Sequence, residues 1–210
     1  MKEELNLDNF KKIMEKIAAT IDKNSSYLSE LDSFVGDGDH GATISRGFSG
    51  VIKKIEEKPP DNISDLLKTI GLTLISSMGG ASGPIFGSIF IAMAKTVEGK
   101  DNIGLSELKD MFSDALDKIM KLGGAVPGDK TLVDSLKPIV DSLKNSYSKG
   151  LSLKKAASLA ESSALKGAES TKDMVAKKGR SKYLGERSVG YQDAGATTMY
   201  LIMKSINDSI

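Results

Sequence analysis

The chain has 210 residues, of which 40% are hydrophobic, so it is long enough to fold as one domain with a substantial core. Its net charge of +1 argues against broad binding to nucleic acid or to a membrane surface. It contains no cysteine, which excludes disulfides and thiolate zinc sites and fits a reducing compartment. Its first residues lack the apolar run of a secretory signal. We therefore expect a cytoplasmic protein made of one domain, residues 1–210.

Apolar residues recur at three- and four-residue spacing along most of the chain, and this pattern predicts amphipathic helices. The first stripe runs from Phe10 to Ile21, with Asp8 as the expected N-cap. Further helices are predicted over residues 42–55, 66–79, 85–93, 108–122, 132–143, 153–168 and 196–206. The sequence shows no strand-type alternation and no strand–helix–strand rhythm. It therefore predicts an all-α bundle of about eight helices.

One stretch without charge, residues 69–94, is long enough to cross a bilayer. Pro84 follows a run of small residues in its middle, and such a run breaks a helix. Each half is too short to span lipid. We expect two buried helices joined by a loop.

Three carboxylates lie close together in the glycine-rich stretch 31–41. Asp32, Asp37 and Asp39 would repel one another unless a cation joined them, so a hard divalent ion is the first hypothesis. The stretch also fits Gly-x-Gly-x-x-Gly, but a dinucleotide site needs a preceding strand and would place two aspartates against pyrophosphate. A calcium loop fails because Phe48 stands where the closing glutamate belongs. An Asp-Gly turn with solvated charges remains the alternative.

Three further loops offer groups that can bind an anion. Residues 79–84 place free amides and the Ser82 hydroxyl at a helix N-terminus, although taken alone they fit a tight helix–helix turn better. Residues 123–131 resemble a Walker A loop, but they follow a helix and carry one extra residue, Asp129, before Lys130 and Thr131. They still offer amides, a lysine and a hydroxyl, unless they are a plain connector with Asp129 as N-cap.

The fourth loop, residues 177–188, carries five cations against one acid, and Arg180 or Arg187 could clamp a phosphate. Taken alone, its charges fit a solvated loop better. His40 is the only histidine, a candidate phosphate contact, proton carrier or phosphorylation site, or simply a polar loop residue. Loops from alternate connections of an up-down bundle meet at one end. A metal site beside several anion sites is the apparatus of phosphoryl transfer.

In chain order, residues 31–41, 79–84, 127–131 and 179–188 resemble the nucleotide-binding L subunit of bacterial dihydroxyacetone kinases. The resemblance implies an eight-helix antiparallel up-down barrel, with ADP or ATP held through Mg²⁺ in the loops at one end. It implies Asp32, Asp37 and Asp39 as metal ligands and Arg180 as the catalytic residue. The residues that it places around the nucleotide are His40, Gly41, Ala42, Thr43, Ala81, Ser82, Gly123, Thr131, Arg180 and Asp193.

The resemblance further implies a phosphoenolpyruvate-dependent kinase in which bound ADP works as a coenzyme. A phosphohistidine-carrying M subunit of the phosphotransferase system would recharge the ADP, and the phosphoryl group would pass to dihydroxyacetone on a separate K subunit. The alternatives are the L part of an ATP-dependent kinase, the nucleotide-binding part of a different kinase, and a regulatory module that senses nucleotide. Neither nucleic acid nor a membrane is expected as a partner. The oligomeric state stays open, a homodimer included.

Overall fold

The computed structural model describes residues 4–210, and this part of the chain is all-helical apart from one isolated β-bridge between Leu5 and Ile103. The all-α prediction is therefore confirmed. The described helices are α1 (Leu7–Lys23), α2 (Ser25–Ser33), α3 (His40–Glu57), α4 (Ile63–Ser77), α5 (Ser82–Thr96), α6 (Leu105–Gly123), α7 (Val133–Ser148), α8 (Leu153–Ser170) and α9 (Ala194–Asn207), with the 3₁₀ segments η1 (Thr171–Asp173) and η2 (Ser181–Ser188).

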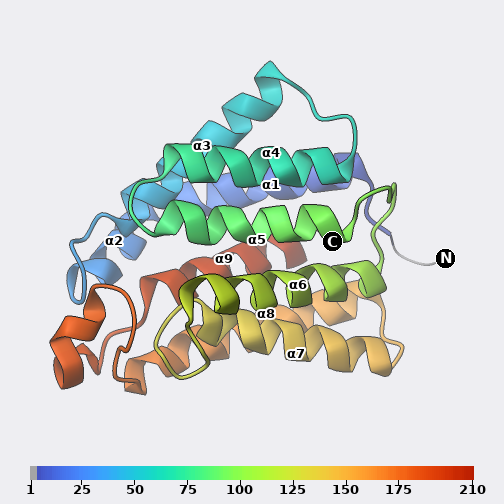
Figure 1. The fold of residues 1–210 in the computed structure, drawn as a ribbon. Helices are drawn as coiled ribbons and strands as arrows, with labels where there is room; N and C mark the ends of the chain where they lie inside the picture. Colours follow the sequence, from blue (N-terminus) through green and yellow to red (C-terminus); the bar gives the residue numbers. More distant parts are fainter. Residues whose placement is uncertain (1–3) are drawn as a thin grey trace.

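Eight long helices of the described chain form a closed antiparallel ring (Figure 1). Each of α3 to α9 packs against the next one along the chain, and α1 lies between α9 and α3 and closes the ring. The predicted up-down barrel is confirmed. The short helix α2, which the sequence analysis missed, packs on α3 at one end of the ring. It was missed because only Leu28 and Leu31 are buried in it, too few to show a period.

Helix starts follow from local capping chemistry. The Asn6 side chain accepts a hydrogen bond from Asn9 N at 3.0 Å, and the Asn9 side chain accepts one from Asn6 N at 3.0 Å. The prediction of Asp8 as N-cap is therefore wrong, because Asp8 lies inside the first turn that Asn6 caps. At the other end of the chain, Asp193 caps α9 by accepting from Ala196 N at 2.7 Å.

The uncharged stretch forms two helices, as predicted, and they cross very closely. A Cβ placed on Gly71 of α4 would lie 2.7 Å from the carbonyl oxygen of Gly87 of α5, so neither glycine leaves room for a side chain. Phe90 of α5 then meets Phe48 of α3 edge to face, with ring centroids 6.2 Å apart. Within the described residues, no helix has both the length and the apolar character needed to span a membrane.

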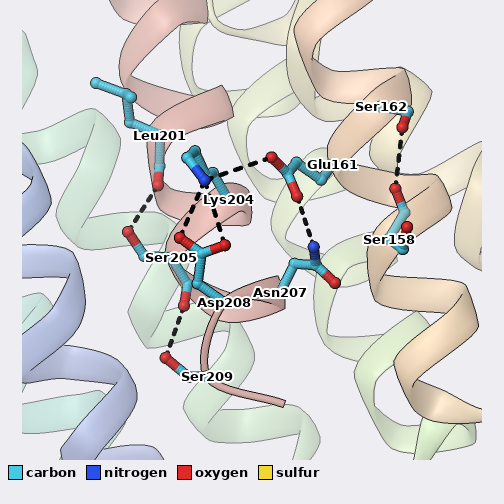
Figure 2. Close-up of polar contacts among 9 residues, drawn as sticks. All are labelled: Ser158, Glu161, Ser162, Leu201, Lys204, Ser205, Asn207, Asp208 and Ser209. Carbon is cyan, nitrogen blue, oxygen red and sulfur yellow. Dashed lines mark hydrogen bonds and ion pairs between the residues drawn. The ribbon is translucent and has the colours of Figure 1, made fainter.

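A polar cluster fastens the last turns of α9 to α8 (Figure 2). Lys204 Nζ lies 3.0 Å from Asp208 Oδ2 and 3.8 Å from Glu161 Oε1. Asn207 Nδ2 donates to the other Glu161 oxygen at 2.6 Å. The buried face of α8 carries mostly alanines, and a Cβ placed on Gly167 of the same helix would lie 3.0 Å from Ser135 Cα of α7, so the two helices approach closely.

The connections alternate between the two ends of the barrel. Residues 24–39, 78–81, 124–132 and 171–193 lie at the end drawn on the left of Figure 1. These four segments contain the glycine-rich or charged loops that the sequence analysis singled out. The up-down topology thus brings segments more than 130 residues apart to one place, as expected for a bundle of this kind.

Candidate functional site

The four gathered connections surround a cavity of about 530 Å³. A cavity of this size accommodates a small organic ligand. Most of the residues that the sequence analysis placed at a metal or nucleotide site line it. These residues are Asp32, Asp37, Asp39, His40, Thr43, Ala81, Ser82, Gly123, Thr131, Arg180 and Asp193.

Two of the predicted residues, Gly41 and Ala42, are not among the residues that line this cavity in the described chain. Ala42 is exposed on α3, whereas Gly41 is buried against α2. A Cβ on Gly41 would lie 2.8 Å from both Ser25 C and Ser29 N, which are backbone atoms of α2. The structure therefore gives Gly41 a packing role at the α2–α3 contact.

The three aspartates form the acidic side of the cavity. One carboxylate oxygen from each of Asp32, Asp37 and Asp39 lies within 4.8 Å of the other two. Gly38 adopts a φ of 75°, which glycine tolerates far better than other residues, and this turn brings Asp37 and Asp39 back toward α2. Gly36 permits the same approach, since a Cβ there would lie 2.9 Å from Asp32 Cγ. Three close oxygen ligands on a tight loop fit a hard divalent cation such as Mg²⁺.

Residues 32–39, which carry the three aspartates, are called the acidic loop below. A cation from another segment that lines the cavity reaches this acidic loop. The Arg180 guanidinium forms an ion pair with the Asp37 carboxylate, joining two segments that are far apart in the chain. Lys178 lines the cavity beside it. Arg187, the other arginine that the sequence offered as a phosphate clamp, is not among the described residues that line the cavity. Arg180 and Lys178, together with Arg46 of α3, which also lines the cavity, therefore supply positive charge at this site.

Neither of the two helices that begin at the cavity is capped by its own N-cap side chain. Ala81 precedes α5 and Asp39 precedes α3, and in the described structure neither side chain bonds to a first-turn amide. At α3, however, Asp32 Oδ2 accepts from His40 N at 3.3 Å, so the helix start without a side-chain bond is that of α5. The Ala81, Ser82 and His40 residues at these two helix starts all line the cavity. Free first-turn amides and the positive end of a helix dipole suit a phosphate group. The anion site predicted for residues 79–84 thus has the geometry that it requires.

In the loop 123–131, the predicted anion contact of Lys130 is not found. Lys130 is 1% exposed, and its Nζ donates to the carbonyl oxygens of Thr171 at 2.8 Å, Ser188 at 2.7 Å and Tyr191 at 2.5 Å. These bonds use all three hydrogens of the ammonium group. The hypothesis that this side chain contacts an anion is therefore wrong, because its hydrogens are bound inside the fold.

The alternative reading of this loop, with Asp129 as the N-cap of α7, is wrong as well. The Asp129 carboxylate instead accepts from Val126 N at 3.0 Å within the loop. Asp134, inside the first turn of α7, accepts from Gly128 N at 2.5 Å and from Thr131 N at 2.8 Å. The loop is thereby held against α7, with Thr131 facing the cavity.

Two titratable groups of the cavity wall have altered proton affinities. Burial lowers the pKa of His40, and the nearby Asp32 charge only partly opposes it, so the imidazole is neutral at pH 7. Its Nε2 lies 2.9 Å from Thr198 Oγ1. Burial also raises the pKa of Asp193 to about 7, assisted by the negative charges of Asp134 and Asp32, while the Ala196 N–H and Lys130 lower it.

The sequence analysis missed the apolar wall of the cavity. Ile85 and Phe86 from α5, Ile119 from α6 and Leu132 before α7 line it. From their helical spacing alone, these residues are expected to pack in the core. The available signal was their position, because Ile85 and Phe86 directly follow the glycine-rich loop 79–84. An apolar wall facing an acidic loop suits a ligand with a flat apolar part and a phosphorylated part.

Fold and site together define an all-α domain whose end cavity suits a phosphorylated ligand beside a divalent cation. The DAK2 domain family matches residues 34–208, so the chain belongs to this family. It is 45% identical over 182 residues to the "PEP-dependent dihydroxyacetone kinase, ADP-binding subunit DhaL" of Escherichia coli, covering 87% of each chain. It is 34% identical over 202 residues to the "PTS-dependent dihydroxyacetone kinase, ADP-binding subunit DhaL" of Lactococcus lactis, covering 96% of this chain and 97% of the relative.

A solved structure shows the same fold. The dihydroxyacetone kinase of C. freundii, crystallised with AMP-PNP and Mg²⁺, superposes with a TM-score of 0.75 at 26% identity. That match covers 100% of this chain but 35% of the C. freundii chain, so the present chain corresponds to about a third of that kinase. The nucleotide and the ion named for that complex are the two ligand types that the geometry here favours.

Proposed function

We propose that this chain is the ADP-binding L subunit of a phosphoenolpyruvate-dependent dihydroxyacetone kinase, which transfers a phosphoryl group to an alcohol. The observation that carries the proposal is the set of three carboxylates within 4.8 Å of one another, in one cavity with the uncapped N-terminus of α5. The 45% identity to the E. coli ADP-binding subunit over most of both chains supports it. In this proposal residues 1–210 act as one nucleotide-binding domain in the cytoplasm.

In the proposed complex, Asp32, Asp37 and Asp39 hold Mg²⁺ at the phosphate end of ADP or ATP. A bound Mg²⁺ would supply charge neutralisation and alignment for the phosphate chain. First-turn amides of α5 bind phosphate oxygens, and Ile85 and Phe86 contact the base and exclude water. His40, Thr43, Ser82, Gly123, Thr131 and Asp193 complete the proposed nucleotide site.

Arg180 is the proposed catalytic residue. Its guanidinium forms an ion pair with Asp37 of the acidic loop, and this supports a role for Arg180 beside the phosphate end of the proposed nucleotide. Five N–H donors in a planar fork can follow the phosphoryl oxygens as their charge is redistributed during transfer. The other groups at the site position charge and exclude water, which is sufficient for direct phosphoryl transfer.

The phosphoryl donor and acceptor would come from partner proteins. We propose that a phosphohistidine on an M subunit recharges bound ADP, and that the resulting ATP phosphorylates dihydroxyacetone held by a K subunit. The relatives named as subunits of phosphoenolpyruvate- or phosphotransferase-system-dependent kinases support this arrangement. The cavity lies at one end of the barrel, where a second protein can reach the phosphate end of the nucleotide.

The experiment that tests the proposal compares two aspartate variants. Asp37→Ala removes one carboxylate from the acidic loop, whereas Asp101→Ala removes an exposed carboxylate at the opposite end of the barrel. We expect Asp37→Ala to lose Mg²⁺-dependent ADP binding in calorimetry and phosphoryl transfer in the reconstituted K, L and M system, with unchanged helical circular dichroism. Asp101→Ala should behave as wild type. Full transfer by Asp37→Ala would refute the metal role.

A dialysis experiment separates the proposed coenzyme role from the alternatives. Purified protein that retains ADP after extensive dialysis would support a bound coenzyme. Ready loss of ADP would favour an exchanging ATP-dependent kinase. Retention without any dihydroxyacetone phosphate formed in the complete system would favour a nucleotide-sensing regulator.

A further inference from the structure

Apart from the stacking of Tyr191 on Phe34, with ring centroids 4.7 Å apart, the connection between α8 and α9, residues 171–193, has little apolar anchoring. In this segment, which the structure describes in full, Ala176 is the one buried apolar side chain. The segment contains only the 3₁₀ turns η1 and η2 and carries Arg180 near its middle. Ordering such a backbone is costly, so it needs strong polar interactions to keep one conformation.

One ammonium group supplies many of those interactions. Besides its three short bonds to the carbonyls of Thr171, Ser188 and Tyr191, Lys130 Nζ lies 3.3 Å from the carbonyl of Met174. The carbonyls come from both ends of the connection. Lys130 therefore ties the start of the segment to its end, as a bound cation would.

Neighbouring contacts hold the middle of the connection. The Asp129 carbonyl accepts from Lys177 N at 3.1 Å. Ser188 Oγ accepts from Ala176 N at 2.9 Å and donates to Gly185 O at 2.6 Å. None of these contacts involves the residues around Arg180. These residues reach the acidic loop, where Arg180 pairs with Asp37.

We infer that Lys130 is a positioning residue for phosphoryl transfer, because it holds the α8–α9 connection in the conformation that brings Arg180 to the acidic loop. The inference rests on the proposed function in that Arg180 is the group that acts. Lys130 itself donates only to carbonyls of the protein. An ammonium suits this position because its three donors diverge, whereas a guanidinium is a planar fork.

The first test needs no activity. Lys130→Met keeps an unbranched side chain but removes the donors, and Lys172→Met makes the same change at an exposed lysine of the same connection. We expect Lys130→Met to accelerate backbone amide hydrogen exchange across residues 172–191 and to leave the barrel helices unchanged, with no effect of Lys172→Met. Wild-type exchange in Lys130→Met would overturn the inference whether or not the chain proves to be a kinase subunit.

The second test is a double-mutant cycle on phosphoryl transfer in the complete system. Misplacing Arg180 by about 1 Å should lower kcat on the order of 10²-fold in Lys130→Met, while calorimetry shows a much smaller change in Mg²⁺–ADP affinity. In an Arg180→Ala background, Lys130→Met should lower kcat little further, because both substitutions remove the same contribution of Arg180 to transfer. If the fold-loss in kcat of the double variant equalled the product of the two single losses, Lys130 would not act through Arg180.

A second variant covers the case in which Lys130→Met does not fold. Ser188→Ala removes the hydroxyl that links Ala176 to Gly185 and leaves the buried ammonium in place. We expect Ser188→Ala to accelerate hydrogen exchange across residues 172–191 as well. In an Arg180→Ala background it should lower kcat little further. Wild-type hydrogen exchange in Ser188→Ala would show that the connection does not depend on these side-chain hydrogen bonds.

Discussion

Replacing Gly41 by alanine should separate two helices at the acidic loop. A Cβ at this position would lie 2.8 Å from Ser25 C and Ser29 N, and closer still to Ser25 O. Ordinary van der Waals contact begins at 3.4 Å, and the opposing atoms are backbone, so no rotamer change can relieve the overlap. The difference between these distances is about 0.6 Å, and α2 and α3 would have to move apart by more than this because Ser25 O lies closer still.

The size of the effect follows from two opposing contributions. Alanine in a helix is favoured over glycine by about 1 kcal/mol. Overpacking against a rigid neighbour costs about 1–3 kcal/mol, and contact with backbone atoms places this site at the upper end. We therefore expect Gly41→Ala to lower the free energy of unfolding by about 2 kcal/mol. Mg²⁺–ADP affinity should fall as well, because Asp32 at the end of α2 accepts from His40 N at the start of α3.

Urea denaturation followed by far-ultraviolet circular dichroism measures the stability, and calorimetry measures the affinity. The matched control is Gly50→Ala on the same helix, where a Cβ would meet Thr73 and Ser77 at 3.8–3.9 Å. This control should gain up to about 1 kcal/mol from helix propensity. If Gly41→Ala gained stability as Gly50→Ala does, the argument that this glycine is needed for packing would fail.

Two further predictions concern protons at the site. Because burial raises the pKa of Asp193 from 3.8 to about 7, stability should decline as pH rises between these values, by up to about 4 kcal/mol. Asp193→Asn should abolish that decline in denaturation series from pH 4 to pH 8, and parallel pH profiles would contradict it. Thr198 Oγ1 donates to Ala194 O at 2.9 Å, so it accepts from His40 Nε2–H. In ¹⁵N spectra of the single histidine at pH 8, Thr198→Val should lose this tautomer preference and Thr198→Ser should keep it; an unchanged Thr198→Val spectrum would contradict the assignment.

Local chemistry made much of this protein predictable. The three-four spacing of apolar residues predicts eight of the helices because amphipathic periodicity needs only near neighbours. The acidic loop was predictable for the same reason, since Asp32, Asp37 and Asp39 lie within eight positions of one another and two glycines let the chain turn between them. Four loops at one end followed from the up-down topology alone.

What a side chain faces was settled by contacts between distant segments. Lys130 follows a glycine-rich loop and looks like an anion ligand, yet carbonyls of residues 171, 188 and 191 bind it inside the fold. Gly41 belongs to the glycine pattern but serves the α2–α3 contact, and Phe86 follows a core period but faces the cavity. The physical reason is common to all three residues. A helix or loop forms from short-range preferences, whereas the direction and burial of each side chain depend on which segments the closed barrel places against it.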